Sequence, residues 1–394
     1  MGGCMSKKDG KEEAAAVDKT EETAKTEDTP KAEDKAANAE ETPMADDTPK
    51  ADDTPNVDDT PTADDTPKAD DTPKADDTPK ADETGDTPIA AEEPAKESEK
   101  ETKPIVFVLG ASGQIGSATC KSLSEQFGDK VEIRAGVRNP DGASKLKELS
   151  GVTVVQATMA DKNNLVTTLA GISVLYIVVP GSENRTELAA LSMDAAKEAE
   201  VKHLAVVSVP LVDEDIAFGK QFKEIESKVI SLGIPYTLIR LPYFLDNFLG
   251  SASTVKESGK LHLPISGDKS YIVVTTSDAG LASATILSDP SKHEGKTYNI
   301  VSERVTMDGI ATTLSTVLEK EVAFEKVEQD DAKQTYLGIG MPEWQVDGLI
   351  QMFKLVEDGS PATNGENIED FKEITGKEPT SAKDFFTTVV AAFQ

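Results

Sequence analysis

The sequence predicts an α/β protein with a parallel, doubly wound sheet and a smaller C-terminal α+β lobe, preceded by a disordered acidic tail. Three observations support this class. Apolar, strand-like runs alternate with helical segments from Pro104 onward, a glycine-rich turn joins the first strand to the first helix, and residues 1–103 lack Phe, Tyr and Trp. Alternating strands and helices place helices on both faces of a parallel sheet.

The first 103 residues hold 32 acidic side chains and 14 lysines, a net charge of −18 within the chain's −31. Such a segment cannot bury enough apolar surface to offset the entropy of ordering, so we predict disorder. The motif Asp-Asp-Thr-Pro recurs with a six-residue period between Asp46 and Thr78. Its regular prolines favour an extended spacer with Thr-Pro sites open to proline-directed kinases, and solubilising filler is the alternative.

The first residues, Met1-Gly2-Gly3-Cys4-Met5-Ser6, match the N-myristoylation pattern, in which the Gly2 amine is acylated. Cys4 is a candidate for S-palmitoylation, and two acyl chains anchor a protein stably where one does not. We therefore expect a peripheral protein on the cytoplasmic face of a membrane. A chance match, leaving a soluble cytoplasmic protein, is the alternative.

Composition excludes several other classes. Neither part of the chain has the basic excess that nucleic-acid binding requires, and no run of about 18 apolar residues could span a membrane. Two cysteines, Cys4 and Cys120, provide no disulfide framework. The three histidines are scattered, so no metal site is expected.

The folded part, residues 104–394, begins with the apolar strand Ile105–Leu109, a turn and a helical segment to Phe127. In this context the turn is expected to bind the pyrophosphate of a dinucleotide, because glycines let the backbone come close and the helix N-terminus favours an anion. A merely tight turn is the alternative. The predicted cofactor residues are Gly110, Ala111, Ser112, Gly113, Gln114, Ile115 and Gly116.

The second strand, expected at 131–137, is followed by Arg138. An acidic residue at this strand end favours NAD, whereas an arginine favours the 2′-phosphate of NADP. Arg138 therefore predicts NADP(H), with NAD(H) and an ordinary solvated arginine as the alternatives.

The remaining elements follow in order and divide into a core, about 104–245, and a substrate-side lobe, about 246–394. Core strands are expected at 152–156, 173–179, 203–209 and 236–241, and core helices at 162–169, 187–199 and 222–231. Lobe strands are expected at 261–264, 272–275 and 296–301, and lobe helices at 277–287 and 307–318. The lobe should close one side of the cofactor cleft and form the substrate pocket.

Several of these segments together resemble the NmrA-like family of atypical short-chain dehydrogenases/reductases. The matching segments are Gly110-x-x-Gly113-x-x-Gly116, Ala135 to Pro140, Gly233 to Arg240 with Phe244 and Asn247, and Lys296 to Ile300. The resemblance implies an extended Rossmann fold that binds NAD(P). It leaves activity open, because the family is similar both to quinone and dye reductases and to regulators that bind dinucleotide without turnover.

The wider group uses a Tyr and a Lys four residues later for proton transfer, and by the family's spacing these positions fall on Phe218 and Phe222. Neither can transfer a proton. Ser208 occupies the place of the group's catalytic serine, with a packing role as the alternative. Lys223 would need a one-residue shift in register to act as the lysine. Cys120 is expected to be a buried, inert thiol rather than a redox group.

The leading hypothesis is a membrane-tethered, NADP(H)-binding, redox-responsive regulator or scaffold that acts through a protein partner, since the phosphate loop is intact and the Tyr/Lys pair is absent. The alternative is an NADPH-dependent oxidoreductase of quinone-like or other conjugated acceptors. A third hypothesis is a surface-associated structural protein.

Overall fold

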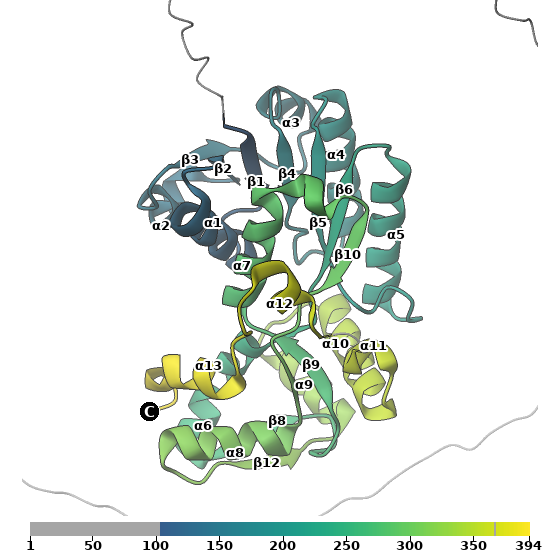
Figure 1. The fold of residues 1–394 in the computed structure, drawn as a ribbon. Coiled ribbons are helices and arrows are strands. Elements are labelled where there is room, and N and C mark those ends of the chain that lie inside the picture. Colours follow the sequence, from purple (N-terminus) through teal and green to yellow (C-terminus); the bar gives the residue numbers. More distant parts are fainter. Residues whose placement is uncertain (1–102, 366–367) are drawn as a thin grey trace, which may run out of the picture. The chain divides into compact units, whose positions relative to one another are not determined.

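The computed structural model describes residues 103–365 and 368–394 (Figure 1). The acidic segment predicted to be disordered, its Thr-Pro repeat and the candidate acylation sites Gly2 and Cys4 lie outside the described residues. Within the described ranges, no helix combines the length and apolarity that a membrane crossing demands.

A seven-stranded, fully parallel sheet forms the core, in the order β10-β6-β5-β4-β1-β2-β3. The strand order reverses between β1 and β4, and ligands of open α/β sheets bind at such a switch point. The predicted Rossmann architecture is confirmed. The strands are β1 (Ile105–Leu109), β2 (Glu132–Val137), β3 (Val152–Gln156), β4 (Val174–Ile177), β5 (His203–Ser208), β6 (Tyr236–Arg240) and β10 (Lys296–Asn299).

Helices cover both faces of this sheet because its strands carry apolar side chains on both sides. One face packs against α1 (Gln114–Phe127), α2 (Ser144–Lys147), α7 (Thr276–Ser288) and α12 (Asp370–Thr375). The other packs against α3 (Lys162–Thr168), α4 (Arg185–Glu198) and α5 (Ala217–Ser231).

A smaller lobe has its own apolar core and lies below the carboxyl ends of the strands in Figure 1. Its strands are β7 (Tyr243–Phe244), β9 (Tyr271–Val274) and β11 (Glu303–Val305) in one sheet, and β8 (Lys260–Leu263) with β12 (Ala323–Lys326) in another. Its helices are α6 (Ala252–Ser258), α8 (Met307–Leu318), α9 (Gln329–Gly338), α10 (Glu343–Asp358), α11 (Pro361–Asn364) and α13 (Ala382–Thr388). The described residues also include the 3₁₀ segments η1 (Pro140–Gly142), η2 (Leu245–Ser251), η3 (Pro290–His293) and η4 (Val390–Ala392).

Two elements that the sequence assigned to the lobe belong to the core, so that prediction was wrong. The strand expected at 296–301 is β10, which pairs in parallel with β6 and extends the main sheet. The helix expected at 277–287 is α7, which packs along α1. The crossover through α7 returns the chain to the sheet edge after the first lobe elements, and no local pattern signals that return. The boundary at residue 245 stays a prediction.

The contact between α1 and α7 leaves no room for a side chain at Gly280. A Cβ at this position would lie 2.7 Å from the Cβ and from the carbonyl carbon of Ala118 on α1. Backbone and a packed methyl group cannot move aside cheaply, so Gly280 sets the distance between the two helices.

We expect Gly280→Ala to lower the free energy of unfolding by about 1–3 kcal/mol, the usual cost of overpacking a core. Gly338→Ala is the control, because Gly338 is also a helical residue, the last of α9, but nothing lies within 4 Å of its Cβ position. Urea unfolding of both variants measures the difference. Equal stabilities of the two variants would show that the α1–α7 contact relaxes freely.

Candidate functional site

The glycine-rich turn after β1 is held in a tight conformation that requires glycine. Gly110 has a φ of +88°, in the left-handed region that side chains disfavour. The backbone N–H groups of Gly110 and Ala111 donate to the Gly136 carbonyl at 3.2 and 3.1 Å. A Cβ on Gly116 would lie 2.4 Å from the Gly110 carbonyl oxygen, so α1 can start this close to the turn only with glycine there.

The N-terminus of α1 is uncapped. Its N-cap residue is Gly113, which has no side chain to accept a hydrogen bond from the first turn. Among the described residues, none accepts the backbone N–H groups of Gln114, Ile115 or Gly116. Free N–H groups and the helix dipole suit an anion such as a pyrophosphate.

A cavity of about 730 Å³ opens beside this turn at the carboxyl ends of β1, β2, β3 and β4. Six of the predicted cofactor residues line it: Gly110, Ser112, Gly113, Gln114, Ile115 and Arg138. Ala111 and Gly116 lie behind the turn, where both are buried. The other lining residues include Gly136, Val137, Thr158, Met159, Val178, Pro180, Ser182, Asn184, Leu188 and Phe244.

Arg138 lies on this cavity with an exposed side chain, and no described residue forms an ion pair with it. Arg134, on the preceding strand β2, differs because its Nε donates to Glu132 Oε1 at 2.9 Å. The guanidinium of Arg138 is therefore available to an anion in the cavity.

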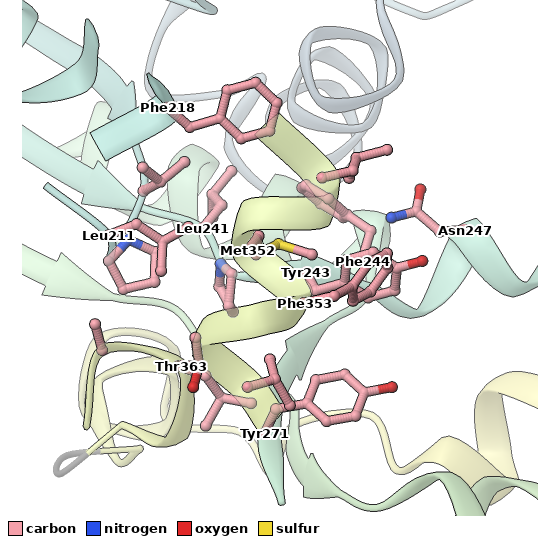
Figure 2. A pocket seen from close by; sticks show the side chains of 17 residues that line it. Leu211, Phe218, Leu241, Tyr243, Phe244, Asn247, Tyr271, Met352, Phe353 and Thr363 are labelled. Atoms are coloured by element: carbon pink, nitrogen blue, oxygen red, sulfur yellow. The ribbon is translucent and has the colours of Figure 1, made fainter. Parts of the chain in front are cut away.

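A second, smaller cavity of about 170 Å³ lies between the core and the lobe, and Figure 2 shows the side chains around it. Phe244 lines both cavities, so the two adjoin at this residue. The helix α10 supplies one wall through Leu349, Met352, Phe353 and Val356. The other lining residues are Val209, Pro210, Leu211, Phe218, Leu241, Pro242, Tyr243, Asn247, Tyr271, Ile272, Ala362 and Thr363.

The lining of this second cavity includes no Lys, Arg, His, Asp or Glu. Two of its hydroxyl groups already donate hydrogen bonds, Tyr271 to Met307 Sδ at 3.2 Å and Thr363 to the Ser360 carbonyl at 2.9 Å. Burial raises the pKa of Tyr243 above its ordinary value, so this hydroxyl stays neutral at physiological pH. The cavity therefore favours an uncharged, apolar ligand.

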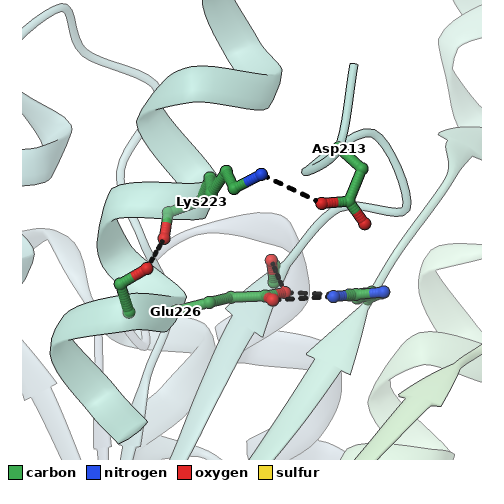
Figure 3. Close-up of polar contacts among 6 residues, drawn as sticks. Asp213, Lys223 and Glu226 are labelled. Atoms are coloured by element: carbon green, nitrogen blue, oxygen red, sulfur yellow. Dashed lines mark hydrogen bonds and ion pairs between the residues drawn. The ribbon is translucent and has the colours of Figure 1, made fainter. Parts of the chain in front are cut away.

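The hydroxyl of Ser208 is hydrogen-bonded to the buried ion pair of Glu226 and Arg240. Ser208 Oγ donates to Glu226 Oε1 at 2.6 Å, and Arg240 donates to both oxygens of Glu226 at 2.8 and 2.7 Å (Figure 3). Ser208 is fully buried. The packing role of Ser208 fits this arrangement, since its proton is held by Glu226 and the network joins α5 to the ends of β5 and β6.

The lysine considered as a misregistered catalytic residue is also paired elsewhere. Lys223 Nζ donates to Asp213 Oδ1 at 3.2 Å in an exposed ion pair (Figure 3). The side chain of Lys223 does not line either cavity.

Phe218 and Phe222, which occupy the positions of the group's Tyr and Lys, surround the guanidinium of Arg185. The carbon Cζ of Arg185 lies 5.2, 5.3 and 5.2 Å from the ring centroids of Phe218, Phe222 and Trp344. Arg185 is only 8% exposed, and desolvation lowers its pKa. No described carboxylate forms an ion pair with Arg185. The cation–π contacts with the three rings offset part of the cost of burying its charge. Its Nε donates to the carbonyl of Ser182, a residue that lines the larger cavity.

Sequence reasoning missed both Arg185 and α10. An arginine in a helical segment is ordinarily solvated, and nothing local distinguishes this one. For α10 a signal was present, because Val346, Leu349, Phe353 and Val356 recur at helical spacing. Cys120 is fully buried, and burial raises its pKa to about 12, consistent with the expected inert thiol.

The family model of the NmrA-like family matches residues 102–386. The chain belongs to the NmrA-like family. Quinone oxidoreductase 2 of Escherichia coli is 29% identical over 275 residues, covering 69% of this chain and 92% of that protein. A Citrobacter triphenylmethane reductase, solved in complex with NADP(H), is 28% identical with a TM-score of 0.64, covering 73% of this chain and 99% of that one.

The structure of NmrA, a negative transcriptional regulator in complex with NADP, has a TM-score of 0.63 at 16% identity, covering 73% of this chain and 96% of that one. At this identity the likeness concerns the fold alone. The two relatives of 28–29% identity described above are reductases, which supports the oxidoreductase hypothesis for this NmrA-like protein better than the regulator hypothesis.

We expect Glu226→Gln to lower the free energy of unfolding by about 2–4 kcal/mol, because it leaves the largely buried Arg240 without its partner. The side chains of Arg240 and Glu226 are 23% and 8% exposed. Asp215→Asn is the matched control, since it breaks the exposed pair with Lys220 and should leave stability nearly unchanged. Urea unfolding compares them, and a Glu226→Gln loss as small as the control's would rule out a structural role for the network.

Proposed function

We propose that this NmrA-like protein is an NADPH-dependent oxidoreductase that reduces an apolar, conjugated acceptor. The observation that carries the proposal is the apolar cavity that adjoins the dinucleotide-type cavity at Phe244. A protein that only senses dinucleotide does not require an apolar pocket beside the dinucleotide site, whereas a reductase requires a place for its acceptor there. The two reductases among its relatives support the same assignment.

The residues of the larger cavity fit a dinucleotide. The uncapped first turn of α1, with the free N–H groups of Gln114 and Ile115, suits the pyrophosphate. Gly113 faces the cavity without a side chain, and Arg138 suits a 2′-phosphate. When bound, a reduced nicotinamide coenzyme supplies a hydride.

The chain's own residues explain why a conjugated acceptor fits best. Phe218 and Phe222 cannot donate a proton, and the proton of Ser208 is bound to Glu226. An acceptor such as a quinone delocalises the negative charge after hydride addition, so it can take its proton from water. An isolated ketone has no such delocalisation, and we propose that it is not a substrate.

The regulator hypothesis remains the competing candidate, because the Tyr/Lys pair is absent from the positions that the family's spacing gives. Steady NADPH oxidation with a quinone, lost in Gly113→Asp, would support the oxidoreductase. Gly113→Asp should disturb binding without disturbing the fold. Its Cβ would meet only the Gly110 carbonyl oxygen at 3.4 Å, an ordinary contact, while its carboxylate would repel the phosphates of the coenzyme. NADPH binding by calorimetry without oxidation of any acceptor would support the regulator.

For coenzyme choice, we expect Arg138→Ala to raise the KM for NADPH about 10- to 100-fold, the cost of losing a charge-assisted hydrogen bond. The KM for NADH should change little, because NADH lacks the 2′-phosphate. Arg134→Ala is the matched control, since Arg134 pairs with Glu132 and does not line the cavity. Steady-state kinetics with both coenzymes measures the effect, and equal losses with NADH and NADPH would contradict this role of Arg138.

We further propose that acylation at Gly2 and Cys4 tethers the protein to a membrane, with the acidic segment as a spacer. The sequence pattern supports this, and these residues lie outside the described part of the structure. Full-length protein from eukaryotic cells should carry acyl chains by intact-mass analysis and sediment with phosphatidylcholine vesicles. Gly2→Ala should abolish both properties and Cys4→Ser should weaken sedimentation. An unacylated wild-type protein would refute the tether.

A further inference from the structure

We infer that the acceptor is an uncharged, single-ring quinonoid molecule, and that the ring of Phe244 is the wall that limits acceptor size. This inference rests on the proposed function and narrows it. It separates this protein from relatives that reduce large dyes, such as the triphenylmethane reductase.

The size limit follows from the volume of the apolar cavity. Its 170 Å³ is far below the roughly 300–1,000 Å³ of pockets that hold drug-sized ligands. It is close to the approximately 150 Å³ of an engineered protein cavity that binds benzene. One six-membered ring with small substituents fits, whereas three aryl rings around a central carbon do not.

The charge limit follows from the lining. The cavity offers no cationic side chain to an anionic acceptor, and moving a charged group into apolar surroundings is costly. Two carboxylates of this part of the chain are already engaged, since Ser360 Oγ donates to Glu214, and Lys326 and Ser266 donate to Glu357. The net negative charge of the chain also disfavours an anionic acceptor.

Phe244 separates the two cavities and is held in place by its strand. It lies on β7, where it pairs with Val274 of β9, and its ring packs against the core cluster that includes the α7 side chains. No other described residue lines both cavities. Truncating this ring would join the 170 Å³ space to the 730 Å³ cavity, so the acceptor space would expand.

The first test measures kcat/KM for NADPH oxidation by the full-length protein with matched acceptors. The neutral single-ring probe is 2,6-dimethyl-1,4-benzoquinone. Comparing it with 1,4-naphthoquinone tests size among neutral acceptors, comparing 1,4-naphthoquinone with its 2-sulfonate tests charge, and malachite green, a cation with three aryl rings, tests both limits together. We expect the single-ring quinone to be the best acceptor, the sulfonate to be at least about 10-fold worse than its neutral partner, and the dye to be inactive.

The second test uses Phe244→Ala, with Leu249→Ala as the control. Leu249 is partly exposed on η2 and lines neither cavity. We expect Phe244→Ala to lower kcat/KM for the single-ring quinone and to raise it for the larger neutral 1,4-naphthoquinone, while Leu249→Ala keeps the wild-type pattern. A gain of activity cannot result from misfolding.

Binding without turnover separates failure of this inference from failure of the proposed function. Trp344 is the chain's single tryptophan, and its ring lies 6.3 Å from the ring of Phe218, which lines the cavity. Saturable quenching of Trp344 emission by the single-ring quinone, without the same effect from the sulfonate, supports the pocket even if no acceptor is reduced. Reduction of malachite green by the wild-type protein as readily as of the small quinone overturns the inference and leaves the oxidoreductase standing.

Discussion

The contact between the glycine turn and the start of α1 is the constraint on which the rest of this structure depends. Gly116 lies so close to the Gly110 carbonyl that a single methyl group would separate them. This close approach aims the free N–H groups of α1 into the larger cavity. The same helix α1 packs against α7 at Gly280, and α7 is followed by β10 at the edge of the sheet. Both ends of this arrangement therefore depend on α1, one through Gly116 and the other through Gly280.

Around the carboxyl ends of β5 and β6, charged groups maintain structure rather than perform chemistry. The pair of Glu226 and Arg240 takes up the hydroxyl of Ser208, and three aromatic rings enclose Arg185. Aromatic side chains stand at 218 and 222, where the family resemblance places a Tyr and a Lys, and Phe218 contributes to the lining of the apolar cavity. Under the proposed function, such a site favours acceptors that stabilise their own anion.

Much of the core could be predicted because its signals are local. The third strand and the helix Met307–Leu318 have the predicted bounds, and the glycine turn lies where its spacing indicated. The errors have a common cause. β10 and α7 were assigned to the lobe because they follow it in sequence, but pairing between β10 and β6 is a long-range contact. The helix α10 went unpredicted although its apolar spacing was readable, and it supplies a wall of the apolar cavity.

The sequence by itself determined the acidic tail, the alternation of strands and helices, the phosphate-type turn, the arginine after β2 and the family resemblance. Each depends on residues close together in the chain, where backbone conformation and composition are decided. Only the tertiary structure decided that Phe244 stands between two cavities, that Arg185 is enclosed by Phe218, Phe222 and Trp344, and that Ser208 is bound to Glu226. Those contacts join residues from separate helices and strands, and packing of the whole domain brings them together.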